Sequence, residues 1–148
     1  MIIIGILAVA AISRFSGTED FDRRGFYDET LAALRYAQKA AIAQRRNVCV
    51  AFTATTVTLT IAAAAGSASS CAPGTNLPSP TGANPFVVTP RIAGISFVTA
   101  PTGFQFDALG RPRTTATPAD AFIATQTFQV AGLPLDITVE QETGYVHP

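Results

Sequence analysis

The side chains that most often carry out chemistry in proteins are few in this chain of 148 residues. The one histidine, His147, stands next to the C-terminus, where we expect an exposed tail residue. One histidine and two separated cysteines do not have the spacing of zinc ligands. The sequence shows no Ser-His or Cys-His arrangement and no glycine-rich loop that would cradle a phosphate. It therefore predicts no catalytic residues, no metal, no cofactor and no enzyme activity.

The two cysteines, Cys49 and Cys71, are the first candidates for covalent chemistry. In an oxidising compartment they could form a bridge that closes a loop of about 22 residues and stabilises the fold by roughly 3 kcal/mol in the chain-entropy model. The alternative is a pair of buried free thiols. The bridge depends on export, because cytosolic thiols are kept reduced.

A basic pair, Arg111 and Arg113, follows Gly110. Two arginines that are two residues apart in extended chain project to the same side and could contact phosphates of DNA. Two such contacts give only weak, salt-sensitive binding, so the alternative is a solvated turn. We expect Asp107 to cap that turn, over 106–112, and not to act in catalysis.

Composition limits the class of protein. Ten Lys and Arg balance ten Asp and Glu, so nothing global attracts nucleic acid or an anionic membrane. Charged residues are only 14% of the chain, and between Asn47 and Phe106 the one charge is Arg91. Such a Thr/Ser/Gly/Pro-rich surface is more common in exported proteins, and near-zero net charge favours association. We therefore expect an exported assembly subunit.

The chain opens with an apolar segment, Met1 to Ile12, within a first unit that we place at 1–15. Twelve residues make a helix of about 18 Å, too short for a hydrocarbon core of about 30 Å. No basic residue precedes the apolar run, so it does not read as a secretory signal peptide. The segment is either a buried core helix or the end of a longer span that begins upstream.

A second unit, 16–46, reads as an amphipathic helix from about Asp20 to Arg46. Ser16 and Glu19 have capping-box spacing, and Asp20 and Arg24 can pair one turn apart. The apolar stripe that should face the core comprises Tyr27, Leu31, Leu34, Ala37, Ala41 and Ile42. The opposite, solvated face comprises Arg24, Asp28, Arg35, Lys39 and Arg46.

The third unit, 47–148, changes to short alternating segments that predict a β-rich head. The expected strands are 48–53, 57–62, 86–89, 94–99, 103–106, 122–130, 135–141 and 145–147. A long loop over 63–85 holds Cys71, and Gly144 sits in a tight turn where it can take positive φ. One long helix followed by many short strands predicts an α+β fold with an antiparallel β-rich head.

A resemblance to a known family begins in the apolar segment. The run from Ile4 to Ile12, followed by Arg14-Phe15, resembles the second half of the N-terminal helix of type IV pilins and type II secretion pseudopilins. That family has a basic leader ending in Gly, then a Phe-Thr-Leu-x-Glu start, and both are missing here. A helix that crosses the hydrocarbon core would need roughly eight to ten more residues than this segment has. We therefore expect an N-terminally truncated helix.

The head extends the resemblance to the GspH- and FimT-like minor pilins and pseudopilins. An Ala-rich helix end, Leu34 to Ala43, leads into Val48-Cys49-Val50, and the chain closes with Ile137 to Glu140 and Thr143-Gly144-Tyr145-Val146. Three further stretches resemble the minor pilins of MSHA pilus biogenesis, namely 20–29, 34–39 and 106–112.

The resemblance implies a non-enzymatic subunit that assembles or primes a type IV pilus. Its partners would be other minor and major pilins, and its N-terminal helix would be methylated and cross the bacterial inner membrane once, with the head in the periplasm or outside. Helix packing would use Ile4, Ile6, Leu7 and Ile12 together with Tyr27, Leu31 and Leu34. Arg111 and Arg113 resemble the DNA-binding signature of FimT-like pilins, although some 35 residues follow them here. A type II secretion role would differ only in partners.

Overall fold

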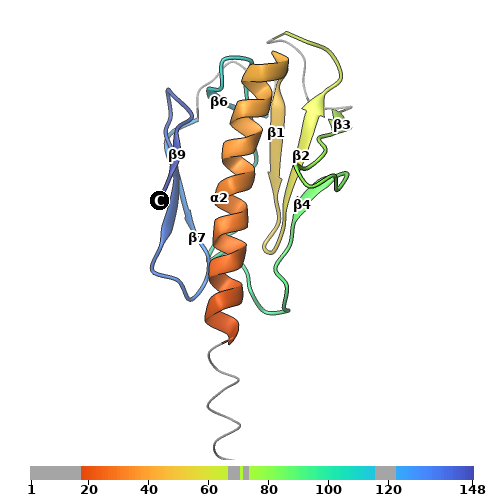
Figure 1. The fold of residues 1–148 in the computed structure, drawn as a ribbon. Coiled ribbons are helices and arrows are strands. Elements are labelled where there is room, and N and C mark those ends of the chain that lie inside the picture. The colour runs from red at the N-terminus through yellow and green to blue at the C-terminus, as the bar shows by residue number, and fades with distance from the viewer. Residues whose placement is uncertain (1–17, 67–70, 72–73, 116–122) are drawn as a thin grey trace, which may run out of the picture.

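A computed structural model describes residues 18–66, 71, 74–115 and 123–148. It confirms the α+β fold: one long helix, α2, covers two antiparallel sheets (Figure 1). The elements are α2 (Thr18–Gln44), β1 (Val48–Phe52), β2 (Val57–Ala62), β3 (Gly74–Asn76), β4 (Phe86–Val88), β5 (Phe104–Phe106), β6 (Pro112–Thr114), β7 (Gln126–Gln129), β8 (Asp136–Val139) and β9 (Val146–His147).

The apolar packing residues expected near the N-terminus, Ile4, Ile6, Leu7 and Ile12, lie outside the described residues, as does Ser16 of the capping box. Within the described part of the chain, no helix is long and apolar enough to cross a membrane.

Helix α2 ends in a hydrogen-bonded cap. The backbone N–H of Arg46 donates to Ala41 O at 3.2 Å and that of Arg45 donates to Ile42 O at 3.3 Å. Arg45 has a φ of 51°, the left-handed conformation that this cap requires. The guanidinium of Arg46 then donates to Ala62 O, which ties the end of the helix to the end of β2.

The larger sheet has the order β3-β2-β1-β5-β6, and β4 also lies along β2. Strands β1 and β2 form a hairpin in which Val50 pairs with Leu59, and β1 pairs on its other side with β5. Alternate residues of β1 and β2 point at α2, so Val48, Val50, Leu59 and Ile61 are buried. This alternation, which the sequence predicted, directs one face of the sheet to the helix.

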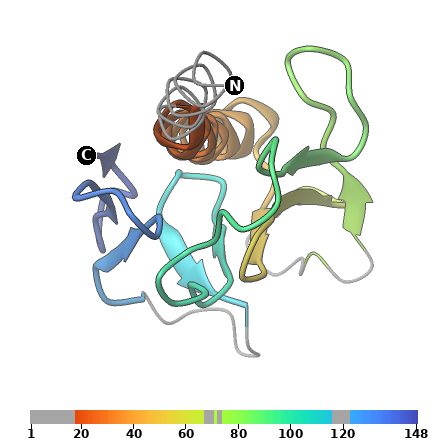
Figure 2. The ribbon, with the colours of Figure 1, turned by 90° about the horizontal axis from the view of Figure 1, so that it is seen from below.

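The smaller sheet has the order β7-β8-β9. Viewed along α2, the two sheets form one curved layer beneath the helix, with β1 to β4 on one side and β7 to β9 on the other (Figure 2). A single antiparallel bridge between Phe97 and Val130 joins the segment after β4 to the end of β7.

The core lies between α2 and this curved layer. Tyr27, Leu31 and Leu34 are buried in it, as the helical stripe predicted. Phe97 is the centre of an aromatic cluster, since its ring lies 5.2 Å from Phe26, 5.9 Å from Phe52 and 5.8 Å from Phe128. These rings come from the helix and from both sheets, so the cluster holds the two sheets under one helix.

Several local expectations were wrong. Residues 94–99 form bends and one bridge instead of a strand, because the segment turns Phe97 into the aromatic cluster. Strand β3 lies inside the predicted loop 63–85, paired with the end of β2. Strand β6 was missed because Pro112 disfavours a strand interior, but β6 is the last strand of the sheet order, where proline is tolerated.

Two expectations for the helix surface also need correction. Ile42, assigned to the buried stripe, is exposed, because it lies against Gly110 of the β5–β6 turn, which has no side chain to cover it. Arg35 is exposed, as its assignment to the solvated face predicted, and its Nε also donates to Val146 O at 3.0 Å. The ion pair in the first turn joins Arg23 to Glu19 at 3.4 Å, where the sequence suggested Asp20 and Arg24.

Candidate functional site

The two cysteines form a disulfide, Cys49–Cys71, as the export reading predicted. Cys49 lies in β1, and its Sγ is 3.5 Å from Oε1 of Gln105 on the neighbouring strand β5. Gln105 is buried and donates through Nε2 to Thr114 O at 3.0 Å. The bridge therefore attaches the segment before β3 to the middle of the larger sheet, on the face away from α2.

Asp107 organises the turn between β5 and β6. Its Oδ1 accepts hydrogen bonds from the backbone N–H groups of Leu109 and Arg111, both at 2.9 Å. Its Oδ2 accepts from Nε of Arg111 at 3.0 Å and from Nε of Arg113 at 2.8 Å. The capping role predicted for Asp107 is confirmed, and both arginines converge on the carboxylate that caps their own turn.

This convergence determines the electrostatics of the basic pair. Burial alone would raise the pKa of Asp107, but hydrogen bonds from the Arg113 side chain, from the backbone of Arg111 and Leu109 and from the Arg111 side chain hold that pKa below its usual value of 3.8. The carboxylate is therefore charged at neutral pH and offsets part of the positive charge. The side chain of Arg113 is only 15% exposed and that of Arg111 is 35% exposed. DNA contact by the pair stays a prediction, and Arg111 is the better placed of the two.

The turn between β8 and β9 packs against the turn between β5 and β6. Nε2 of Gln38 on α2 donates both to Gly110 O, at 3.1 Å, and to Thr143 O, at 2.9 Å. Gly110 and Gly144 have φ values of 79° and 65°, conformations in which glycine is favoured. We call the group of Gln38, Gly110, Thr143 and Gly144 the turn junction.

The turn junction brings together stretches that are separate in the sequence. Gln38 belongs to the Leu-Arg-Tyr-Ala-Gln-Lys run, Gly110 to the 106–112 stretch, and Thr143-Gly144 to the closing turn. The sequence singled out Gly144 for positive φ, but nothing local indicated that the two turns would meet at one glutamine. Three stretches that are far apart in the sequence thus meet at one glutamine in three dimensions.

A row of donors along α2 holds the smaller sheet. Nη1 of Arg23 donates to Ala131 O, the hydroxyl of Tyr27 donates to Asp136 O at 2.9 Å, and Arg35 donates to β9 as described above. Sequence reasoning missed Arg23 and Arg35 as attachment points. The available signal was their spacing, because positions 23, 27 and 35 fall on one side of a helix.

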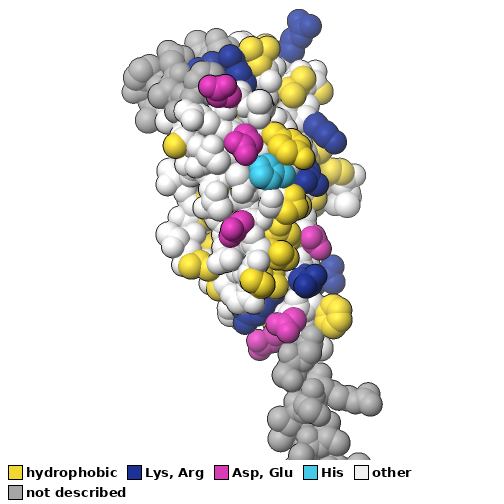
Figure 3. All heavy atoms as spheres, turned by 90° about the vertical axis from the view of Figure 1, so that its left-hand side faces the viewer, with side chains coloured by type: hydrophobic (Ala, Val, Ile, Leu, Met, Phe, Trp, Pro, Cys, Tyr) yellow, Lys and Arg dark blue, Asp and Glu magenta, His cyan; other side chains and the backbone are white. Residues whose placement is uncertain are grey.

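His147 lies in β9 and not in a free tail. Its Nε2 is 3.0 Å from Oε1 of Glu140, and its ring stacks on Tyr145 with centroids 5.1 Å apart. The histidine is the cyan side chain in the middle of the face in Figure 3. The Glu140 hydrogen bond first, and then the Pro148 carbonyl, raise the pKa of His147 above its usual 6.5. This pair attaches the last strand to the preceding one.

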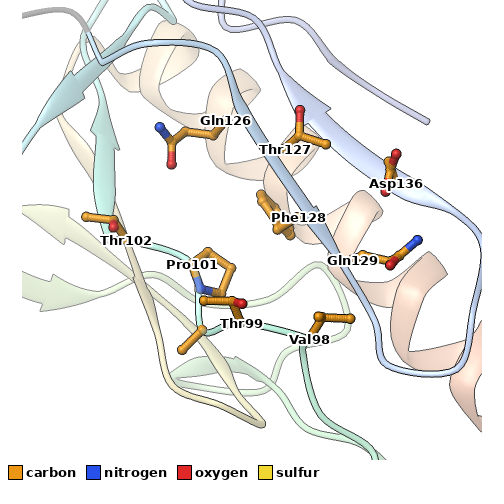
Figure 4. Close-up of a pocket in the computed structure, with 10 residues that line it drawn as sticks. Val98, Thr99, Pro101, Thr102, Gln126, Thr127, Phe128, Gln129 and Asp136 are labelled. Carbon is orange, nitrogen blue, oxygen red and sulfur yellow. The ribbon is translucent and has the colours of Figure 1, made fainter.

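One surface recess, of about 340 Å³, lies between the 98–102 segment and β7. Figure 4 shows Thr99, Pro101 and Thr102 on one side of it and Gln126 and Phe128 on the other. The lining supplies hydroxyl, amide and apolar groups, and its one ionisable side chain is Asp136. In the part of the chain that the structure describes, no group of three or more His, Cys, Asp or Glu could hold a metal ion. We assign no chemistry to this recess.

No family model, no curated protein and no solved structure matches this chain.

Proposed function

We propose that this chain is a minor pilin or pseudopilin, a non-enzymatic subunit that acts in the assembly or priming of a type IV pilus of the MSHA kind. The observation that carries the proposal is the combination of an apolar segment in sequence, residues 1–12, with the long helix that follows it and covers an antiparallel head. In this role the apolar segment contributes to the inner-membrane anchor and later packs among neighbouring helices.

The energetics of the apolar segment support such packing. Its six large aliphatic side chains contribute about 1.5–3 kcal/mol each on burial, so burial of all six contributes about 9–18 kcal/mol before association costs. They are Ile2, Ile3, Ile4, Ile6, Leu7 and Ile12. A head that packs on one helix through an apolar core and polar contacts can then move with that helix from membrane to filament.

The disulfide is consistent with a head outside the cytoplasm, because structural disulfides persist in the periplasm and at cell surfaces. We accordingly propose a single-pass inner-membrane subunit with a periplasmic or extracellular head. Its partners are other minor and major pilins.

Deletion of the gene tests the proposal. We expect few or no pili on the deletion strain by electron microscopy, and restored pili when the gene is supplied again. Affinity purification of the tagged full chain from detergent-solubilised membranes should recover other minor pilins. Normal pilus numbers without the gene would count against a role in assembly.

A second candidate is a DNA-binding minor pilin of the FimT kind. The partly exposed guanidinium of Arg111, at the surface of the β5–β6 turn, favours it. The test is a salt-titrated DNA-binding assay that compares the intact protein with the Arg111→Ala, Arg113→Ala double variant. Equal affinity of the two proteins would remove this candidate. A type II secretion pseudopilin would be recognised by its partners, because they would be secretion components instead of pilins.

A further inference from the structure

Five of the six exposed large hydrophobic side chains of the described residues lie at the two ends of the head, and the sixth is Val87. At the end where α2 begins, Phe21 is 78% exposed and Val98 is also exposed. Val98 belongs to this end because its N–H donates to Gln129 O, next to the turn that Arg23 holds. We call this end the base. Figure 3 shows hydrophobic, acidic and basic side chains together there.

The opposite end has three exposed apolar side chains, one near the end of α2 and two in the turns that follow β5 and β8: Ile42, Leu109 and Tyr145. The turn junction brings them together, since Ile42 packs against Gly110, the neighbour of Leu109, and Gly144 approaches Gly110 closely. We call this end the crown. It lies at the top of Figure 1, where α2 ends.

Charge is also divided between the two halves of the head. The half that contains the base holds six carboxylates and three arginines, which gives a net charge of −3: Glu19, Asp20, Asp22, Asp28, Glu29 and Asp136 against Arg23, Arg24 and Arg91. The half that contains the crown holds six cations and three carboxylates, which gives +3: Arg35, Lys39, Arg45, Arg46, Arg111 and Arg113 against Asp107, Glu140 and Glu142. These groups are the charged side chains of the described residues.

The two ends therefore both expose apolar side chains and lie in halves of opposite net charge. The base offers an exposed phenylalanine between two aspartates, and the crown offers an apolar surface beside exposed cations such as Lys39 and Arg45. The ends are separated by the 27 residues of α2, about 40 Å of helix, so one molecule cannot join its own two ends. Two copies can, through a heterologous contact that repeats.

We propose that the base of one copy of this chain binds the crown of a second copy, head to tail, with Phe21 on the apolar surface formed by Ile42, Leu109 and Tyr145. This inference rests on the proposed function, because it names a partner within the filament or its priming complex. The contact joins opposite charges, so added salt weakens it.

Thiol cross-linking in membranes of cells that make the full chain tests the contact. One copy, with a first epitope tag, has Phe21→Cys, and a second copy, with another tag, has Leu109→Cys. The native cysteines are already paired, so a short bismaleimide should give a dimer that contains both tags. The matched control replaces the second copy with Val87→Cys, an exposed apolar position away from both ends.

Reversing the charges on the two sides of the contact gives a second test. Lys39→Glu with Arg45→Glu on the crown should abolish the mixed dimer, and Asp20→Lys with Asp22→Lys on the partner's base should restore it. Restoration also shows that the altered copies are folded. Absence of the mixed dimer, or a dimer of equal yield with Val87→Cys, would overturn the proposal. So would capture of a different pilin by Leu109→Cys, a result that leaves the proposed function standing.

Discussion

Gly144 lies so close to Gly110 that a β-carbon on Gly144 would come nearer than 3.0 Å to the carbonyl oxygen of Gly110. The obstacle is backbone, which cannot rotate away as a side chain can. Gly144 also has a φ of 65°, which costs an L-residue about 1–2 kcal/mol. We expect Gly144→Ala to lower the free energy of unfolding by about 2–4 kcal/mol in urea denaturation.

Two other glycines provide controls for this prediction. Gly82 also has positive φ, but a β-carbon there would meet nothing within 4 Å. Gly82→Ala should therefore lower the free energy of unfolding only by the part that the positive φ causes. Gly25 lies inside α2 with open space around it, so Gly25→Ala should stabilise by about 0.5–1 kcal/mol. If Gly144→Ala cost no more than Gly82→Ala, the two turns would not be in contact.

Asp107→Asn should destabilise the head by about 2–3 kcal/mol, because two arginine side chains lose a charged acceptor. The loss should depend on pH. The folded pKa of Asp107 lies below 3.8, so in that range the unfolded chain binds more protons and stability rises with pH. The contribution of the Asp107 carboxylate to the stability of the fold is complete above about pH 4 and disappears as pH falls through the folded pKa. Urea titrations of both proteins from pH 2 to pH 7 check this, and a difference that is constant with pH would contradict it.

The disulfide should contribute about 3 kcal/mol, because it closes a loop with a sequence separation of 22. We expect Cys49→Ser with Cys71→Ser to lower the unfolding free energy by about that amount. Intact mass under non-reducing conditions, before and after thiol alkylation, checks that the exported protein contains no free thiol. Alkylation of both cysteines in the folded, unreduced protein would contradict the paired state.

The His147–Glu140 contact predicts a second pH dependence, of opposite sign. The folded pKa is raised, so the contribution to stability is complete below about pH 6.5 and is lost as pH rises through the folded pKa. An NMR titration of the histidine ring should give a pKa above 6.5 in the natural protein and a lower one in Glu140→Gln. An unchanged pKa in Glu140→Gln would show that the carboxylate is not the partner.

The sequence predicted the parts of the fold that depend on periodicity. The buried stripe of Tyr27, Leu31 and Leu34 and the alternation along β1 and β2 follow from local patterns. It failed where a long-range contact overrides local preference. Residues 94–99 were expected to form a strand, but the segment makes a bridge at Phe97, whose ring packs with rings from α2 and β7.

In the candidate site too, local features were predicted and long-range contacts were not. The cap by Asp107 and the turn at Gly144 were predicted, because both are local. The burial of the Arg113 guanidinium against Asp107 was not, because two arginines in a loop read as a solvated pair. The attachment of Gln38 to both turns was also invisible, since residues 38 and 143 are brought together only by the fold.

Pilus number on the deletion strain is the decisive measurement of whether this chain is needed to build a pilus. We predict that cells lacking the gene have few or no pili by electron microscopy and that the gene restores them when supplied in trans. Wild-type pilus numbers on the deletion strain would show that the chain is not needed for assembly.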